Sequence, residues 1–187
     1  MKYLLLISLI LGISSITEKE RIVWYFLMQS GLTKAGAAGL MGNLKAESGI
    51  ESVIYENAWK EKIGLTDQEY VDYVNNGWYS EYDFINDQVG FGLAQWTYCT
   101  RKEALLNHCR GKIGDLNCQL EYLIPEIMNY FPTVNNVIRN SGNVRECALT
   151  VLFDFESPYD QSESVQIYRV SLAEEYYNIF AEGSPSN

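Results

Sequence analysis

The sequence has little basic charge, and this deficit limits the partners that we expect. It has 14 lysine and arginine residues against 24 aspartate and glutamate residues, for a net charge of −10. Binding to nucleic acid phosphates needs a basic surface, so nucleic acid is not an expected partner. The same deficit argues against electrostatic attraction to anionic surfaces in general.

Histidine and closely spaced cysteine pairs are also scarce. The one histidine, His108, stands next to Cys109, and adjacent residues on a helix point about 100° apart, which argues against a Cys–His peptidase. None of the four cysteines forms a C-x-x-C pair, which argues against a zinc site. We therefore expect no metal and no cofactor.

Long apolar runs are missing after the first residues. Lys2 is followed by an uncharged apolar run at residues 4–13, then by Ser14 and Ser15. This run is shorter than the roughly 20 residues that span a bilayer, and the pattern is typical of a secretory signal. We expect residues 1–16 to be a signal peptide, the product to be secreted or lumenal, and no membrane anchor. Removing Lys2 makes the net charge −11.

An even number of cysteines behind a signal peptide indicates two disulfides. Three pairings are possible. A pair between Cys109 and Cys118 across a helix turn, which leaves Cys99 for Cys147, is the arrangement that we favour.

The rest of the chain predicts one mostly helical domain over residues 17–187, and its 47% hydrophobic residues suffice for a core. Capping patterns at Thr17 and Thr66 and a cap at Thr33 predict three helix starts, and apolar spacing predicts later helices near 100–110, 115–130, 143–155 and 163–180. We expect Pro125 to interrupt or kink its helix. Residues 78–96 lack helical spacing and suit a small β-hairpin. Glycines 36, 39 and 42 predict close helix packing.

The second of these helices ends in a carboxyl group with an apolar setting. Glu47 follows a run rich in Leu, Met, Ala and Gly, and Asn43 lies one turn earlier on the same face. Ser48 and Gly49 then turn the chain away. Glycosidic cleavage needs one carboxyl group that stays protonated in apolar surroundings and donates its proton to the leaving oxygen. Glu47 fits that requirement.

A second candidate segment covers residues 87–96. Gly90 and Gly92 flank Phe91 and allow the backbone to approach a ligand, while Gln95 offers a donor and an acceptor to sugar hydroxyl or acetamido groups. We expect Asp87 to face Glu47 across a cleft as a second carboxylate. The candidate substrate-binding residues are Asn43, Ser48, Gly90, Phe91, Gly92, Gln95, Trp96, Trp78 and Tyr98, with Tyr55, Trp59 and Tyr82 as weaker candidates.

These segments resemble the phage tail lysozyme family in four ordered blocks. Residues 38–49 read A-G-L-M-G-N-L-K-A-E-S-G and resemble the catalytic helix. Residues 90–97 with Arg101 and Lys102 resemble the second motif, residues 113–123 the next helix, and residues 155–162 the F-E-x-P segment. Together the blocks cover roughly residues 33–180.

The resemblance implies a two-lobed, mostly helical lysozyme-like fold with a small β or irregular segment beside the cleft, as in goose-type lysozymes and soluble lytic transglycosylases. It implies bacterial peptidoglycan as the substrate, Glu47 as the acid, and Asp87 as the residue that places water. Asp87 stands one residue nearer the first glycine than in the family pattern, so Asp83 is an alternative. Glu156 lines the cleft or, as we favour, makes a structural contact, and we give Glu51 little weight.

Three functions remain open on the sequence. We favour an antibacterial lysozyme that hydrolyses the β-1,4 bond between N-acetylmuramic acid and N-acetylglucosamine, because Asp87 is present. A lytic transglycosylase would use the same acid. A secreted wall-binding protein on an inactive scaffold is the third. We expect a monomer and a stand-alone secreted protein, unlike the modules that form part of larger phage tail proteins.

Overall fold

The computed structural model describes residues 16–181 and 183, so the predicted signal peptide lies outside the described residues except for Ile16. The described part is helical and has no β-strand. No helix in it is long and apolar enough to cross a membrane. The helices are α1 (Glu18–Gln29), α2 (Lys34–Ser48), η1 (Asn57–Trp59), α3 (Lys60–Ile63), α4 (Asp67–Asn75), α5 (Glu81–Asn86), α6 (Cys99–His108), α7 (Leu116–Tyr130), α8 (Pro132–Asn140), α9 (Val144–Thr150), η2 (Val151–Glu156, a π-helix) and α10 (Glu163–Phe180).

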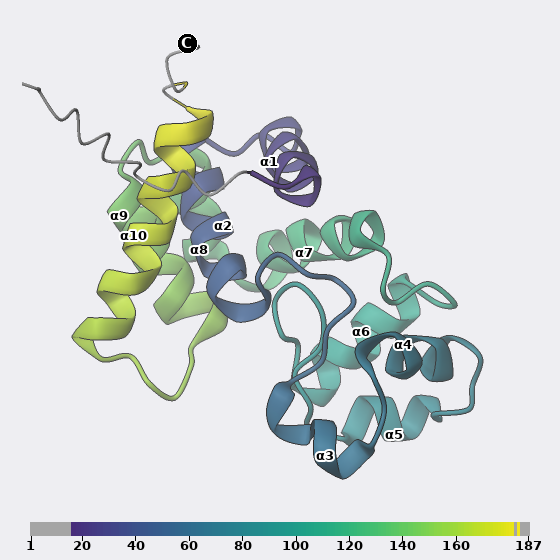
Figure 1. Cartoon of the computed structure of the whole chain (residues 1–187). Coiled ribbons are helices and arrows are strands. Elements are labelled where there is room, and N and C mark those ends of the chain that lie inside the picture. The colour runs from purple at the N-terminus through teal and green to yellow at the C-terminus, as the bar shows by residue number, and fades with distance from the viewer. Residues whose placement is uncertain (1–15, 182, 184–187) are drawn as a thin grey trace, which may run out of the picture.

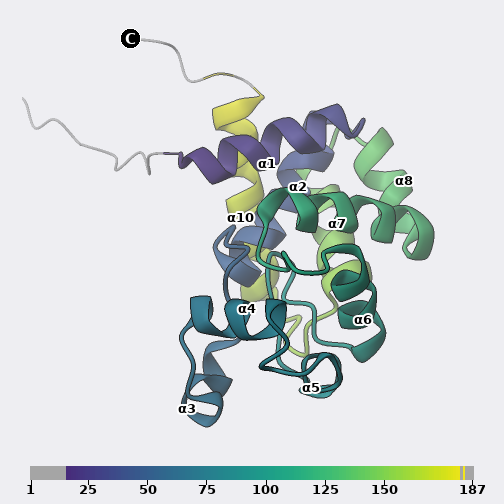
Figure 2. The same ribbon diagram turned by 90° about the vertical axis from the view of Figure 1, so that its right-hand side faces the viewer.

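The helices form two lobes, as predicted (Figure 1). The larger lobe contains α1, α2, α8, α9, η2 and α10, and the smaller lobe contains α3 to α6. Both views place α1 at the top and α3 to α5 at the bottom, with α7 between them (Figures 1 and 2). One cluster of buried apolar side chains includes residues of both lobes, from Val23 on α1 to Tyr176 on α10.

Helix α2 is the centre of the larger lobe because its glycines admit three other helices. A Cβ atom at any of these glycines would lie within 3 Å of a neighbouring helix. The contacts would be 1.8 Å from Gly36 to the carbonyl oxygen of Ile138 on α8, 2.6 Å from Gly39 to Cβ of Cys147 on α9, and 2.7 Å from Gly42 to the backbone nitrogen of Ala173 on α10. The predicted close packing of this helix is confirmed.

A buried carboxylate joins α1 to α2 and α10. Glu20 Oε1 accepts hydrogen bonds from Lys45 Nζ at 2.9 Å and from Tyr176 Oη at 2.5 Å. Burial raises the pKa of Glu20, but the hydrogen bonds from Tyr176, Lys45 and Thr17 outweigh it and lower this pKa to about 2. The ionised group therefore fixes the end of α2 that carries Glu47.

Several helix boundaries agree with the sequence and others do not. Both predicted capping boxes, at Thr17 and Thr66, have their two reciprocal hydrogen bonds. The expected β-hairpin is wrong: two isolated bridges pair Phe91 with Tyr55 and with Trp96. Helix α5 lies within the stretch that lacked helical spacing, α8 was missed, and α7 continues past Pro125. Local caps explain the first two, since Ser80 caps α5 and Pro132 opens α8.

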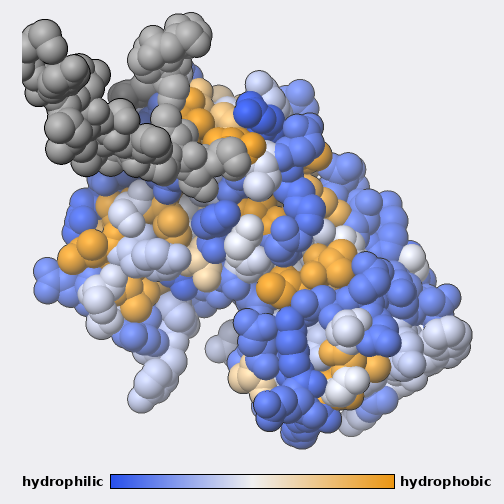
Figure 3. Space-filling model, viewed as in Figure 1, coloured by the Kyte–Doolittle hydropathy of each residue, from blue (hydrophilic) through white to orange (hydrophobic). Residues whose placement is uncertain are grey.

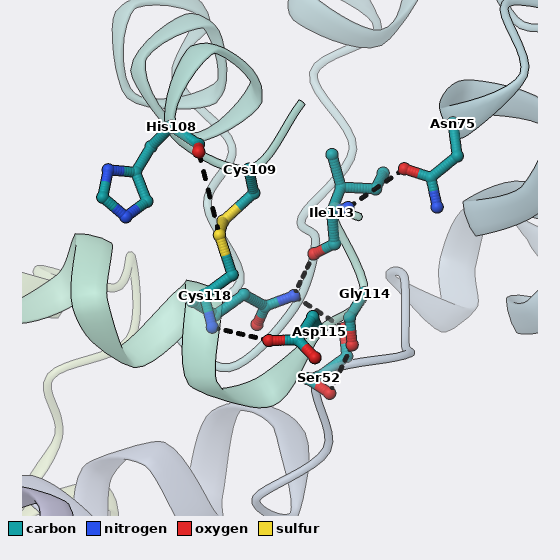
Figure 4. Close-up of a disulfide and its surroundings, with 9 residues drawn as sticks. Ser52, Asn75, His108, Cys109, Ile113, Gly114, Asp115 and Cys118 are labelled. Atoms are coloured by element: carbon teal, nitrogen blue, oxygen red, sulfur yellow. Dashed lines mark hydrogen bonds between the residues drawn. A yellow bond between two sulfur atoms is a disulfide. The ribbon is translucent and has the colours of Figure 1, made fainter. Parts of the chain in front are cut away.

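The disulfide between Cys109 and Cys118 is present, with 5.8 Å between the Cα atoms, and it closes the loop between α6 and α7 (Figure 4). In the same loop Ile113 N donates to Asn75 Oδ1, and Ser52 Oγ donates to the carbonyl oxygen of Gly114. These contacts fasten the loop to the end of α4 and to the segment after α2.

The predicted second disulfide, between Cys99 and Cys147, is wrong. Cys99 is exposed at the start of α6 in the smaller lobe, whereas Cys147 is buried on α9 in the larger lobe, and both thiols are free. Burial raises the pKa of Cys147 to about 11, so this thiol stays protonated at neutral pH. Its role is to pack against Gly39.

Candidate active site

A cleft of about 650 Å³ lies between the lobes. It is lined by the end of α2, by residues 54–58, by parts of residues 90–101, and by residues 156–159. Hydrophilic side chains cover much of the surface around the indentation between the lobes, and apolar side chains appear as separate patches (Figure 3). An open cleft of this kind suits a polar polymer better than a small apolar ligand.

Glu47 lines this cleft from the last turn of α2, as predicted. Its side chain is 19% exposed and forms an ion pair, through Oε1, with Nη2 of Arg169 on α10. No described residue forms a hydrogen bond with Oε2. The carboxylate is thus held on one side and open on the other.

Asn43 supports this ion pair from beneath. Its amide nitrogen donates to the carbonyl oxygens of Gly39 and Ala148, at 2.9 Å each, and its Oδ1 accepts from Arg169 Nη1 at 3.2 Å. The side chain is fully buried and does not line the cleft, so it positions Arg169 rather than substrate. Ser48 is also buried and donates to the carbonyl oxygen of Leu44.

The segment 90–98 divides between cleft and core. Gly90, Gln95 and Tyr98 line the cleft. Phe91 and Trp96 are fully buried, and Trp96 Nε1 donates to Glu126 Oε2, so neither ring offers a face to sugar. Gly92 has a positive φ of 69° and packs so closely on the amide of Gln119 that a Cβ would lie 2.6 Å from its oxygen.

Asp87 does not line the cleft that contains Glu47. It lies in the smaller lobe, where it forms an ion pair with the fully buried Lys102 and accepts hydrogen bonds from Tyr70 Oη at 2.6 Å and from the backbone nitrogen of Val89 at 2.9 Å. The structure therefore brings Glu47 and Asp87 into different surroundings.

Asp87 lines instead a separate cavity of about 550 Å³ that also contains Trp59 and Trp78. The other predicted residues lie away from the cleft or at its wall. Tyr55 lines it but is buried, Tyr82 is exposed on α5, Asp83 contacts Ser80 at the start of α5, and Glu51 pairs with Lys19 on the surface.

The sequence reasoning assigned no role to three residues of the site. Glu56 lines the cleft, its backbone nitrogen donates to the carbonyl oxygen of Gly90, and its Oε2 accepts from the nitrogen of Gly90. Arg101 lines the cleft and forms a two-pronged ion pair with Glu126. The third is Arg169, whose position on α10 gives no sequence signal because its partner lies more than 100 residues earlier.

Glu156 lines the cleft at the end of η2. Its Oε1 is buried and has no hydrogen-bond partner among the described residues. Burial raises the pKa of Glu156 well above its ordinary value, and the nearby charge of Glu47 raises it further, against opposing effects of Arg101 and Arg169. The cleft therefore contains a second carboxyl group that favours its neutral form.

The sequence profile of the phage tail lysozyme family matches residues 18–180. The chain belongs to this family. It is also similar to morphogenesis protein 1 of Bacillus phage B103, with 22% identity over 160 residues that cover 82% of this chain and 37% of the phage protein. The chain thus spans well under half the length of that relative.

Lysozyme is the activity for which this family is named. The geometry of this phage tail lysozyme family member fits that chemistry in outline. A carboxyl group with one open oxygen faces a polar cleft between two lobes, and a second carboxyl group favours its neutral form nearby. Both groups lie on the larger lobe.

Proposed function

We propose that the protein is a secreted peptidoglycan glycosidase that cleaves the β-1,4 bond between N-acetylmuramic acid and N-acetylglucosamine, with Glu47 as the general acid. The observation that carries this proposal is the position of Glu47, which ends an apolar helix at the cleft and has one oxygen, Oε2, that forms no hydrogen bond with any described residue. A protonated Glu47 would donate to the glycosidic oxygen as the bond to C1 breaks.

The rim of the cleft supplies surfaces for sugar. Tyr98 is 72% exposed, and Tyr159 is exposed on the facing segment of the other lobe. Both are free to stack on sugar rings, and Gln95, which also lines the cleft, offers its side-chain amide to an acetamido substituent. With a net charge of −10, binding to the wall would depend on such local contacts.

The group that attacks the sugar is either water, in a lysozyme, or a hydroxyl group of the sugar itself, in a lytic transglycosylase. The sequence favoured hydrolysis because of Asp87, and that support weakens because Asp87 is bound by Lys102 and two tyrosines away from the cleft. Glu56 is the carboxylate that lines the cleft from the smaller lobe. We assign to Glu56 the placement of the attacking water in a lysozyme reaction.

A lytic transglycosylase is the second candidate, and the position of Asp87 favours it. That reaction needs the acid but no carboxylate to place water, because a hydroxyl group of the sugar itself attacks. Mass spectrometry of the released fragments separates the two reactions: reducing ends indicate hydrolysis, and anhydro-muramyl ends indicate the transglycosylase. We also propose that the protein is secreted, on the pattern of residues 1–16 alone. From the sequence we further propose that it is a monomer with a single domain over residues 17–187.

The test compares wild type, Glu47→Gln and Glu51→Gln on a zymogram of purified bacterial wall. Glu51 is four residues from Glu47 but lies outside the cleft in a surface pair with Lys19, so it is a matched control. We expect wild type and Glu51→Gln to clear the wall. The activity of Glu47→Gln should be lower than that of wild type by about 100-fold or more. Equal clearing by all three would overturn the assignment of Glu47. Binding of wild type without clearing would indicate an inactive wall-binding protein.

A further inference from the structure

The pairing of Glu47 with Arg169 raises a problem for its proposed role. A cation in contact with a carboxylate favours the ionised form, whereas a general acid must hold a proton. A general acid that is paired with an arginine therefore benefits from a second carboxyl group close by that holds a proton.

Glu156 has the position and surroundings of such a source. It lines the same cleft, and its Oε1 is buried without a partner, although the residue as a whole is partly exposed. A buried ionised carboxylate without donors is costly, while a neutral one is tolerated. Burial and the charge of Glu47 both raise the pKa of Glu156.

The backbone around Glu156 is unusual in two ways. Residues 151–156 form a π-helix, a geometry often found at functional sites, and Ser157 follows with a positive φ of 43°. This φ is a strained value for a residue other than glycine. The two features end η2 beside the cleft and place the carboxyl group there instead of on the surface.

The charged groups around Glu156 come from four elements. Glu47 lies on α2, Arg101 on α6, Glu126 on α7 and Arg169 on α10. Arg101 is occupied by a two-pronged pair with Glu126, and Arg169 by Glu47 and Asn43. Neither arginine forms a hydrogen bond to Glu156, so ionised Glu156 has no direct counterion.

We propose that Glu47 and Glu156 share one proton, and that Glu156 is the positioning residue that stores it while Glu47 is paired with Arg169. When substrate enters, the proton passes from Glu156 to Glu47 through a water molecule in the cleft, because the two carboxyl groups form no direct hydrogen bond. Glu47 then donates it to the glycosidic oxygen, the bond from C1 to that oxygen breaks, and the leaving sugar departs as an alcohol. The attacking water or sugar hydroxyl group releases one proton, which returns to the pair. This inference rests on the proposed function.

The test is the pH dependence of wall cleavage by wild type, Glu156→Gln and Asp154→Asn. Gln mimics the neutral carboxyl in shape but stores no exchangeable acid proton, and Asp154 is an exposed carboxylate on the same η2 segment that does not line the cleft. We expect the alkaline limb of the Glu156→Gln profile to move to lower pH by about one unit or more, since interacting carboxyls share their apparent pKa values. Activity at neutral pH should fall about tenfold or more, while Asp154→Asn keeps the wild-type profile. An unshifted limb in a folded Glu156→Gln overturns the proposal.

A readout that needs no activity separates this proposal from the proposed function. Side-chain carboxyl NMR of the full chain follows the titration of Glu156 in wild type and in Glu47→Gln. We expect its midpoint to lie above the ordinary range in wild type and to fall in Glu47→Gln, because the neighbouring negative charge is gone. An unchanged midpoint overturns the shared proton even if Glu156→Gln fails to fold. Wild type that cleaves no wall removes the proposed function, whatever the titration shows.

Discussion

Asp87 in the smaller lobe and Glu47 in the larger lobe are both carboxylates paired with a cation, yet their surroundings differ in one respect. Asp87 is 8% exposed, pairs with a lysine that is 0% exposed, and accepts further hydrogen bonds from Tyr70, Tyr79 and the backbone of Val89. Glu47 is 19% exposed and has Arg169 as its partner.

The difference lies in how many protein donors each carboxylate has. Both oxygens of Asp87 are occupied by donors of its own lobe, so it has no lone pair to offer a substrate. Glu47 keeps one oxygen toward the cleft. Saturation with protein donors marks a carboxylate that holds structure, and an open oxygen at a cleft marks one that is available for chemistry.

We expect the largest difference between the two carboxylates when each is replaced by a neutral group. Asp87→Ala leaves the Lys102 ammonium buried without its counterion. Burial already lowers the pKa of Lys102, and Asp87 partly offsets that effect. We expect a loss of about 3–5 kcal/mol in the free energy of unfolding, measured by urea denaturation, as for other broken buried pairs.

Glu47→Gln should show the opposite pattern, with a change of about 1 kcal/mol because Arg169 keeps Asn43 as an acceptor and the cleft admits water. Its activity should be lost, whereas the folded fraction of Asp87→Ala should remain active. If Asp87→Ala proves as stable as wild type but inactive, then Asp87 belongs in the mechanism and the contrast between the lobes fails.

The fold was predictable where local chemistry decides it. Capping boxes at Thr17 and Thr66 depend on residues three apart. The glycines of α2 indicate close packing even when the partner helices are not known. For the same reason Glu47 was identifiable, since its apolar helix is continuous in sequence. The missed α5 and α8 are short and depend on single capping residues, Ser80 and Pro132, that weigh little against a weak apolar pattern.

The rest of the site depends on contacts between distant segments. Arg169 reaches Glu47 from 122 residues away, and Lys102 approaches Asp87 from the next helix. Trp96 resembled a sugar platform in sequence, but its indole bonds to Glu126 in the core. Residue type and spacing identified candidate functional residues. Only the packing of α6, α7 and α10 decides which of them face the cleft.

Removal of the disulfide should destabilise the smaller lobe and leave the larger lobe unchanged. Cys109 and Cys118 are 9 residues apart, and closing a loop of this length stabilises a protein by about 2–3 kcal/mol in the loop-entropy account. We expect the double variant Cys109→Ser with Cys118→Ser to lose about that much. Hydrogen exchange should rise first around α4 and the 109–118 loop, with Cys99→Ser as a control that changes nothing. Equal loss of protection in α2 and α10 would mean that the lobes do not differ in this respect.

Gly36→Ala is the smallest and most local test, and it addresses the larger lobe. The new Cβ would lie 1.8 Å from the carbonyl oxygen of Ile138. A backbone atom cannot relieve this clash by changing rotamer as a side chain can. Overpacking costs about 1–3 kcal/mol, and the better helix propensity of alanine returns about 1 kcal/mol, so we expect a net loss of up to about 2 kcal/mol. Gly142→Ala, where a Cβ meets nothing within 4 Å, is the control and should be neutral. Because α2 also carries Glu47, a shift of this helix against α8 should lower wall cleavage along with stability. Loss of the disulfide should lower stability alone, since the loop that it closes contributes no residue to the cleft.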